Sequence, residues 1–420
     1  MMRRLVRWPV RVWRSLGPGL ITGAADDDPS GIATYSIAGA QFGLAFLWTA
    51  LLTWPLMAAV QIMCARIGMV TGRGLMAAMR NRFPRWVLVC AAVALLIANT
   101  LNVGADLAGM SDAAELLTGL NSHGWVFVFG AGLAIGTLEL HYLTIARVLR
   151  WLALVLFAYV VTGVILRPEW GTVLRAALTP SVPSGREGWA MLVAILGTTI
   201  SPYLFFWQAA QEVEEEKARG RYTLGQRRGA TKEEIQNRNL DVGAGTFFSN
   251  LVMFFIVLTT ALTLHRHGLT TLRTSRDVAV ALEPLAGRFA MLLYTVGLVG
   301  TGLLAIPTLT GSAAYAFADT FGWRQGIDQR PHQAPGFYLV VGLATLAGIT
   351  MDFANVNPVR ALFWTAVLNG ILAPVLLFAI LLVASDPKTM QGQPLALLPR
   401  VVVAVAAVVM TGAALALVLL

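Results

Sequence analysis

Charged residues are scarce in this chain. They make up 13% of its 420 residues, whereas about a quarter of an ordinary soluble domain is charged. Hydrophobic residues account for 57%. This composition excludes a disordered chain, a collagen, a coiled coil and an ordinary water-soluble enzyme. Because charges are costly in hydrocarbon, the composition predicts an all-α polytopic membrane protein.

Cysteine is nearly absent as well. The chain contains only two, Cys64 and Cys90, so a disulfide framework is excluded. A net charge of +9 can accompany nucleic-acid binding, but here the basic residues fall in the short gaps between apolar runs. That placement indicates a lipid bilayer as the partner and argues against nucleic acid.

The hydrophobic residues gather into about 11 segments with the roughly 20 mostly apolar residues that a spanning helix needs. These segments are 17–42, 44–66, 86–110, 124–143, 147–167, 189–211, 243–264, 288–318, 336–352, 359–384 and 399–420. The first, sixth and eighth contain internal glycine or proline residues, which predict breaks in those helices.

Most of the 31 basic residues fall in alternate gaps between these segments, beginning with the N-terminal region. Cytoplasmic loops carry an excess of Lys and Arg. We therefore expect a cytoplasmic N-terminus, an odd number of spans and a C-terminus outside. The expected location is the plasma (inner) membrane.

The first segment places three aspartates about ten residues into an apolar helix. Asp26, Asp27 and Asp28 are followed at once by Pro29, which lacks an N–H and should break the helix. Unpaired carbonyls and neighbouring carboxylates are tolerable inside a membrane only against a cavity or a ligand. A bound hard cation satisfies both, because it takes carboxylate and carbonyl oxygens. The alternative is a span that begins after Pro29, with the aspartates as helix caps in water.

A second break is predicted in the sixth segment, which has Ser201 and Pro202 at its middle. Two proline-broken helices five spans apart are typical of inverted repeats that hold a substrate between the breaks. We expect one transmembrane domain over 1–420. Its parts are a first repeat at about 17–167, a second repeat at about 189–384 and an extra helix at about 399–420.

Other polar residues within the segments have two interpretations each. Thr365 and Asn369 lie at i and i+4 on one helix face, where they either supply oxygens to a central site or form a helix–helix hydrogen bond. Asp106 lies in the third segment, either on a proton or ion pathway or in a cap or ion pair. The acidic run 214–216 after the sixth segment is either a metal-sensing patch or a solvated helix end.

At these residues the chain resembles the natural-resistance-associated macrophage protein (Nramp) family of divalent-metal transporters, which has the leucine-transporter fold. The family motifs are Asp-Pro-Gly-Asn in the first helix and Met-Pro-His-Asn in the sixth. Here residues 28–31 read Asp-Pro-Ser-Gly and residues 201–204 read Ser-Pro-Tyr-Leu. The resemblance implies a 5+5 inverted repeat plus one extra helix. It also implies metal binding by the Asp28 carboxylate and by the carbonyls of Ala25 and Thr198.

The chain also departs from the family pattern, and the ninth-helix arginines of that pattern are absent. The family's metal-binding Asn and Met, its two sixth-helix His and its third-helix Glu fall at Gly31, Ser201, Tyr203, Gln208 and Gly109. Loss of the sulfur ligand weakens the preference for softer transition metals.

Other oxygen ligands remain, because Asp26 and Asp27 add charge beside Asp28 and Ser201 offers a hydroxyl. Proton coupling is not supported by the resemblance, since its Glu, His and Arg partners are missing. Asp106, Tyr203 and Gln208 remain as candidates for a proton or ion pathway.

The sequence therefore predicts a secondary transporter that moves manganese, iron or magnesium by alternating access. The cation is the substrate, and no cofactor is expected. One alternative is an amino-acid or organic-solute carrier of the same fold, although three aspartates would repel a substrate carboxylate. Another is an intramembrane metal-dependent enzyme, which requires a second acidic or histidine motif that the sequence lacks. Oligomeric state is not indicated.

Overall fold

The computed structural model describes residues 22–23, 25–139, 154–327, 329–354 and 357–420. Within these ranges all regular structure is helical. The α-helices are α3 (Pro29–Phe42), α4 (Leu47–Thr71), α5 (Leu75–Met79), α6 (Arg85–Thr118), α7 (Ser122–Glu139), α9 (Phe157–Ile165), α10 (Trp170–Leu178), α11 (Arg186–Thr199), α12 (Pro202–Ala218), α13 (Leu224–Arg227), α14 (Lys232–Thr263), α15 (Ser275–Ala279), α16 (Glu283–Ala286), α17 (Ala290–Phe321), α18 (Pro335–Met351), α19 (Pro358–Ser385) and α20 (Leu397–Leu419).

Seven helical stretches in the described part of the chain are long and apolar enough to cross a membrane. They contain α4, α6, α11 with α12, α14, α17, α19 and α20. Helix α18 is apolar but has only 17 residues. Parts of the predicted first, fourth and fifth segments fall outside the described residues. The prediction of a helical polytopic membrane protein is confirmed.

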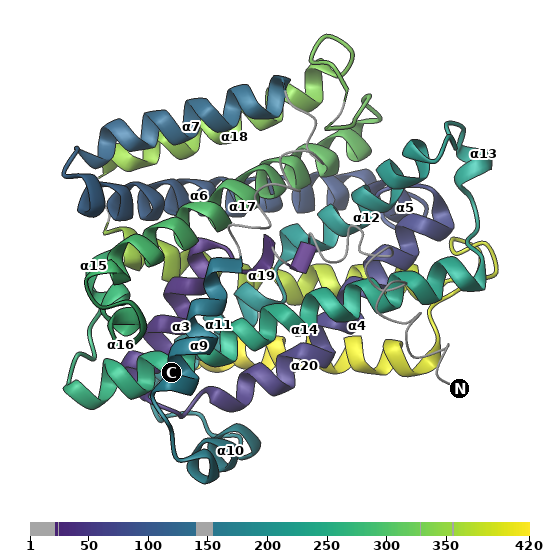
Figure 1. Cartoon of the computed structure of the whole chain (residues 1–420). Helices are drawn as coiled ribbons and strands as arrows, with labels where there is room; N and C mark the ends of the chain where they lie inside the picture. The colour runs from purple at the N-terminus through teal and green to yellow at the C-terminus, as the bar shows by residue number, and fades with distance from the viewer. Residues whose placement is uncertain (1–21, 24, 140–153, 328, 355–356) are drawn as a thin grey trace, which may run out of the picture.

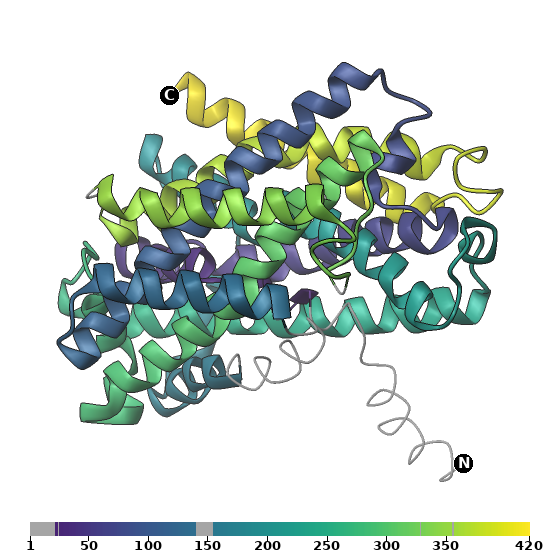
Figure 2. The same cartoon turned by 90° about the horizontal axis from the view of Figure 1, so that it is seen from above.

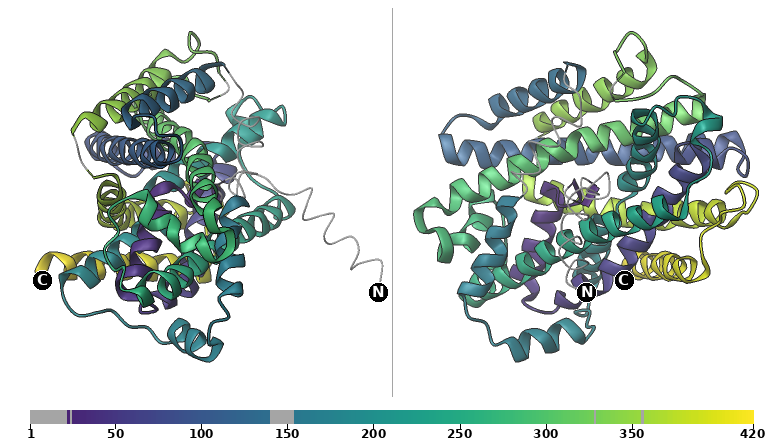
Figure 3. Two further views of the ribbon diagram at one scale, coloured as in Figure 1. Left: turned by 60° about the vertical axis from the view of Figure 1, so that its left-hand side comes forward. Right: turned by 45° about the vertical axis from the view of Figure 1, so that its right-hand side comes forward.

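The long helices lie in layers around helix α3. Helices α7 and α18 run side by side along one edge, and α6 and α17 form the next layer (Figure 1). Helices α4, α14 and α20 lie on the opposite side, as the rotated views also show (Figure 3). The view from above looks along the stacking direction, so the layers lie one behind another there (Figure 2). Helix α3 contacts α6, α11, α14, α17 and α19 and is therefore central.

Small residues allow the central helices to approach one another closely. A Cβ added at Gly39 of α3 would lie 2.0 Å from the Thr260 hydroxyl of α14, and one at Gly197 of α11 would lie 2.0 Å from the Ala366 carbonyl of α19. In lipid, packing of backbones against each other at small residues is a main source of helix association. These two crossings hold α3 closely against α14 and α11 closely against α19.

Both predicted proline breaks are present in the structure. The first separates a helical turn ending at Asp26 from α3, and the second separates α11 from α12 at residues 200–201. Pro29 and Pro202 are each the first residue of the following helix. A helix needs no N–H at that position, so proline there starts a helix instead of interrupting one.

The predicted break in the eighth segment is wrong. Helix α17 runs without interruption from Ala290 to Phe321 with Pro307 inside it. An interior proline costs about 3 kcal/mol, and the contacts of α17 with α6, α12 and α18 hold the helix in spite of that cost.

Candidate metal-binding site

Asp28 lies in the break of the first helix and caps the N-terminus of α3. Its backbone is extended, with φ −72° and ψ 170°. Its Oδ1 accepts hydrogen bonds from the Gly31 N–H and the Ser30 hydroxyl, both at 2.7 Å. Cap bonds and the positive end of the helix dipole both favour a carboxylate here. The motif Asp-Pro-Ser-Gly thus breaks the helix and holds the carboxylate at the break.

The other oxygen of Asp28 faces two different helices. Its Oδ2 lies 3.2 Å from Nδ2 of Asn102 on α6 and 3.4 Å from the hydroxyl of Tyr203 on α12. The Tyr203 hydroxyl also donates to the Ala25 carbonyl at 3.0 Å. Tyr203 is the second residue of α12, so the two helix breaks meet at Asp28. Three of the predicted site residues, Ala25, Asp28 and Tyr203, are therefore in contact.

Asp106 joins this group through a residue that the sequence analysis missed. The Asn102 Nδ2 that contacts Asp28 also lies 3.3 Å from Asp106 Oδ2. The available signal was the pattern on α6, because Asn99, Asn102 and Asp106 occur at i, i+3 and i+7 in an otherwise apolar stretch. That spacing places all three on one face of a helix.

Asp26 and Asp27 lie toward α14. The hydroxyl of Ser249 is 2.6 Å from Asp26 Oδ2 and 3.1 Å from Asp27 Oδ1. The three consecutive aspartates thus divide between two sides of the break, with Asp28 facing α6 and α12. Sequence reasoning missed Ser249, although its position beside Asn250 in an apolar stretch was a signal.

The second break is held by hydrogen bonds between predicted ligands. The Ser201 hydroxyl lies 2.5 Å from the Gly197 carbonyl and 2.8 Å from the Thr198 carbonyl. The Thr198 hydroxyl lies 3.0 Å from the hydroxyl of Tyr35 on α3, a contact that the sequence did not indicate. Because a hydroxyl or carbonyl oxygen has two lone pairs, Ser201 and Thr198 each keep capacity for a further ligand.

The remaining predicted residues have separate environments. Thr365 donates to the Leu362 carbonyl of its own helix at 2.8 Å, and Gln208 donates to Glu212 at 2.7 Å. The Oδ1 of Asn369 is buried without a hydrogen-bond partner among the described residues. Of these three, Asn369 has the oxygen most available for a ligand.

The donor set at the break consists of oxygen atoms. Asp26, Asp27, Asp28 and Asp106 are all buried. Across the residues that the structure describes, no group of three or more His, Cys, Asp and Glu side chains is arranged to hold a metal ion. Any cation held here would be bound by a mixture of carboxylate, amide, hydroxyl and carbonyl oxygens, the ligands that hard cations prefer.

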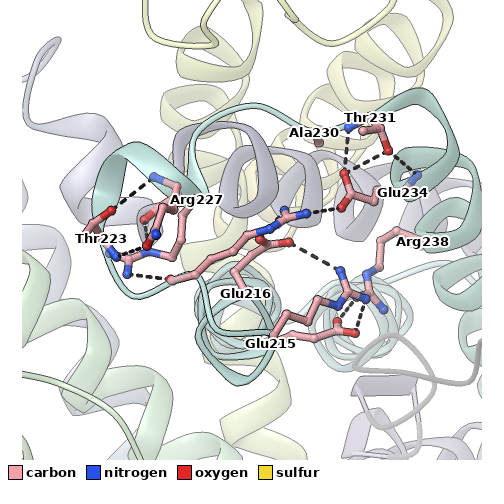
Figure 4. Close-up of polar contacts among 12 residues, drawn as sticks. Glu215, Glu216, Thr223, Arg227, Ala230, Thr231, Glu234 and Arg238 are labelled. Carbon is pink, nitrogen blue, oxygen red and sulfur yellow. Dashed lines mark hydrogen bonds and ion pairs between the residues drawn. The ribbon is translucent and has the colours of Figure 1, made fainter.

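The acidic run 214–216 lies in an ion-pair network at the end of α12. Glu214 pairs with Lys217 at 2.8 Å, and Glu216 pairs with Arg221 at 2.5 Å. Arg221 in turn bonds Glu234 of α14 at 2.9 Å (Figure 4). Glu216 is buried, so this end of α12 is not simply solvated. Its carboxylates have cationic partners within the protein.

Arg238 of α14 is the buried centre of the same network. Its guanidinium bonds Glu212 at 2.7 Å and Asp241 at 2.6 Å. It also pairs with Glu215, as Figure 4 shows. Gln208 bonds Glu212, so the network reaches up α12 toward the second break. These contacts join α12 to α14 on the C-terminal side of the second break.

Comparison with known families gives a match over almost the whole chain. Residues 19–420 match the family described as natural resistance-associated macrophage protein-like, or Nramp. The chain belongs to this family. The resemblance in the sequence motifs is thereby confirmed, despite the changed residues at positions 31, 201 and 203.

Relatives of this Nramp protein include divalent metal cation transporters named MntH. The MntH of Yersinia enterocolitica is 27% identical over 325 residues, covering 74% of this chain and 75% of the relative. The MntH of Pectobacterium carotovorum is 27% identical over 310 residues, covering 71% and 70% of the two chains.

Solved structures share the fold. A crystal structure of the Eremococcus coleocola manganese transporter has a TM-score of 0.75 at 17% identity, covering 97% of this chain and 86% of that one. Mhp1, a nucleobase-cation-symport-1 family transporter, has a TM-score of 0.53 at 14% identity, covering 96% and 92%. At these identities the likeness concerns the fold.

The structure also shows which groups surround two positions, Gly109 and Gly31, at which the chain departs from the Nramp motifs. A Cβ at Gly109 would lie 2.9 Å from the Leu362 side chain, so the family's glutamate is replaced here by close apolar packing of α6 on α19. A Cβ at Gly31 would lie 3.4 Å from Tyr35 and 3.5 Å from Asp28 Oδ1, an ordinary contact. Position 31 therefore borders the Asp28 carboxylate but carries no ligand.

Proposed function

We propose that this Nramp-family protein is a secondary transporter that carries a divalent metal cation across the membrane by alternating access. The observation that carries the proposal is the meeting of both helix breaks at a buried carboxylate, Asp28. Irregular backbone and buried charge at membrane depth are sustained where they bind a transported ion. Relatives named as divalent metal cation transporters support the same class of substrate.

The proposed arrangement is the 5+5 inverted repeat plus one extra helix, about 11 spans in all. Its supports are the two proline breaks, at the spacing typical of inverted repeats, and the fold shared with the manganese transporter and Mhp1. The N-terminus is proposed to be cytoplasmic and the C-terminus external, in the plasma (inner) membrane, on the distribution of basic residues.

In this proposal Asp28 is the main ligand. The Ala25 and Thr198 carbonyls and the Ser201 hydroxyl complete part of its coordination, with Asn369 as a further oxygen donor. Asp26 and Asp27 contribute negative charge from the α14 side. An all-oxygen set favours manganese, iron or magnesium over softer cations.

Coupling to protons is proposed to be weak or absent. Gly109 packs against Leu362 where the family pattern has a glutamate, and the sequence of α18 contains no arginine. Asp106 remains as a buried acid in the middle of α6, and its Oδ2 lies 3.3 Å from Nδ2 of Asn102.

The proposal is tested by uptake into proteoliposomes of the purified full chain. We expect saturable entry of Mn²⁺, Fe²⁺ or Mg²⁺, with little acidification reported by a trapped pH dye. Uptake of an amino acid or nucleobase without cation uptake would favour the organic-solute carrier. Acidification in fixed proportion to cation entry would contradict the coupling proposal and leave cation transport standing.

Replacing Ser201 by methionine is expected to shift selectivity. A thioether adds a soft ligand beside the second break, so preference for Mn²⁺ or Cd²⁺ over Mg²⁺ should rise about tenfold, the equivalent of 1.4 kcal/mol. Competition uptake with the three ions measures the shift. Ser201→Leu adds similar bulk without sulfur and should leave the preference order unchanged. An equal shift in both variants would mean that size, not sulfur, sets selectivity.

A further inference from the structure

The side-chain amide of Asn102 lies between two buried carboxylates. Its Nδ2 is 3.2 Å from Asp28 Oδ2 and 3.3 Å from Asp106 Oδ2, and the three residues come from two helices. All three are at most 2% exposed. Because the amide nitrogen has two hydrogens, it can donate one to each carboxylate. The positive end of the amide dipole therefore lies between the carboxylates of Asp28 and Asp106.

The oxygen of the same amide has no corresponding partner. Asn102 Oδ1 is buried and lacks a hydrogen-bond partner among the described residues, as does Asp106 Oδ1. Buried polar atoms are nearly always bonded, and an orphaned one is unfavourable. Four oxygens therefore lie around one nitrogen: Oδ2 of Asp28, Oδ1 of Asn102 and both carboxylate oxygens of Asp106.

The bonds to Asp28 define the side from which a cation can approach. Oδ1 of Asp28 is occupied by the Ser30 hydroxyl and the Gly31 N–H, both at 2.7 Å. Its contacts at Oδ2 are longer, to Asn102 and Tyr203. A cation would therefore bind Oδ2, which is the atom that the Asn102 nitrogen now faces.

An N–H group and a cation cannot share that position. The final torsion of an asparagine side chain is roughly two-fold, so a half-turn exchanges Nδ2 and Oδ1 at little cost in shape. After the exchange the amide presents Oδ1 to the space between Asp28 and Asp106. Two carboxylates balance the charge of a divalent cation, and the amide adds a neutral oxygen.

We propose that Asn102 is a ligand of the transported cation, which lies between Asp28 and Asp106 and is bound when the Asn102 amide turns its oxygen inward. This inference rests on the proposed transport of a divalent cation. It assigns to α6 an amide ligand in place of the one that Gly31 does not supply. In the cation-free protein the same amide keeps the two carboxylates together through its N–H groups.

The test is Mn²⁺ binding to the purified full chain, measured by isothermal titration. Asn102→Leu removes the oxygen and should weaken binding at least about tenfold, in the range found when groups around metal sites are removed. Asn99→Leu is the matched control on the same face of α6, because Asn99 bonds the Leu309 carbonyl and the Ser312 hydroxyl of α17, both at 2.8 Å. It should change binding less than about threefold.

A second variant separates the ligand from a hydrogen-bond donor that only positions Asp28. Asn102→Asp keeps an oxygen but has no N–H, so it should bind Mn²⁺ at least tenfold more tightly than Asn102→Leu. Equal loss in both variants would overturn the proposal in favour of the positioning role. Wild-type binding by Asn102→Leu would also overturn it while leaving cation transport intact. No binding by the wild type would instead reject the proposed function.

If the leucine variant is not monodisperse, Asn102→Ala takes its place with the same expectation, because alanine cannot overpack the helix face.

Discussion

Asp28→Asn is expected to lower saturable Mn²⁺ uptake into proteoliposomes at least about 100-fold. Asparagine has nearly the same shape and is an equally good helix cap. Its Oδ1 can still accept from Gly31 and Ser30, so the break in the first helix should persist. What is lost is the negative charge on a buried ligand. Removing one partner of a buried charge pair costs about 3–5 kcal/mol, and each 1.4 kcal/mol is tenfold.

The matched control is Asp112→Asn on α6, away from the break. Asp112 accepts from the Ser275 N–H at 3.0 Å, a bond that an asparagine oxygen can also accept. Uptake should remain within about twofold of wild type, because no cation ligand is changed. Saturable uptake by Asp28→Asn equal to that of the wild type would remove Asp28 from the mechanism.

Arg238→Ala is expected to destabilise the protein strongly. The substitution leaves Glu212, which is 2% exposed, without its cationic partner, and Asp241 and Glu215 also lose contacts to Arg238. Loss of one partner in a buried pair costs about 3–5 kcal/mol. At roughly 2 °C per kcal/mol for a large chain, the midpoint of thermal unfolding in detergent should fall by about 6–10 °C.

Arg219→Ala is the control within the same network. Arg219 pairs with Glu215 at 2.7 Å and Glu216 at 3.5 Å, but its side chain is 45% exposed. Exposed pairs contribute about 0–1 kcal/mol, so the midpoint should move by no more than about 2 °C. If the unfolding midpoint fell equally in the two variants, the buried ion pairs of Arg238 would contribute no more to stability than the exposed pairs of Arg219.

The helical membrane fold could be predicted because it depends on local composition. Runs of about 20 apolar residues separated by basic gaps have no other stable structure in a bilayer. The breaks at Pro29 and Pro202 were also local, since each proline begins a helix after a polar residue. Pro307 was misjudged, because the neighbours of α17 determine whether an interior proline interrupts the helix.

The residues of the candidate site could be predicted only where they belong to a recognisable sequence motif. Asp28 could be recognised from the proline beside it, and Ala25 and Tyr203 from the resemblance to Nramp motifs. Asn102, Ser249 and Tyr35 were missed, because each is tied to the site by packing between helices that are distant in sequence. The three aspartates looked equivalent in the chain, yet the break turns Asp28 toward α6 and α12 and the other two toward α14.

The scarcity of charge in the sequence determined that this protein is a bundle of membrane helices with acidic residues at a break. The physical reason is that charged groups and unpaired backbone groups are unfavourable in hydrocarbon. This constraint applies to each segment by itself, so it can be read from the local sequence. Only the tertiary structure decided which side chains surround Asp28. That outcome depends on where α6, α12 and α14 cross α3, and the crossings are set by contacts such as Gly39 on Thr260 that no single segment contains.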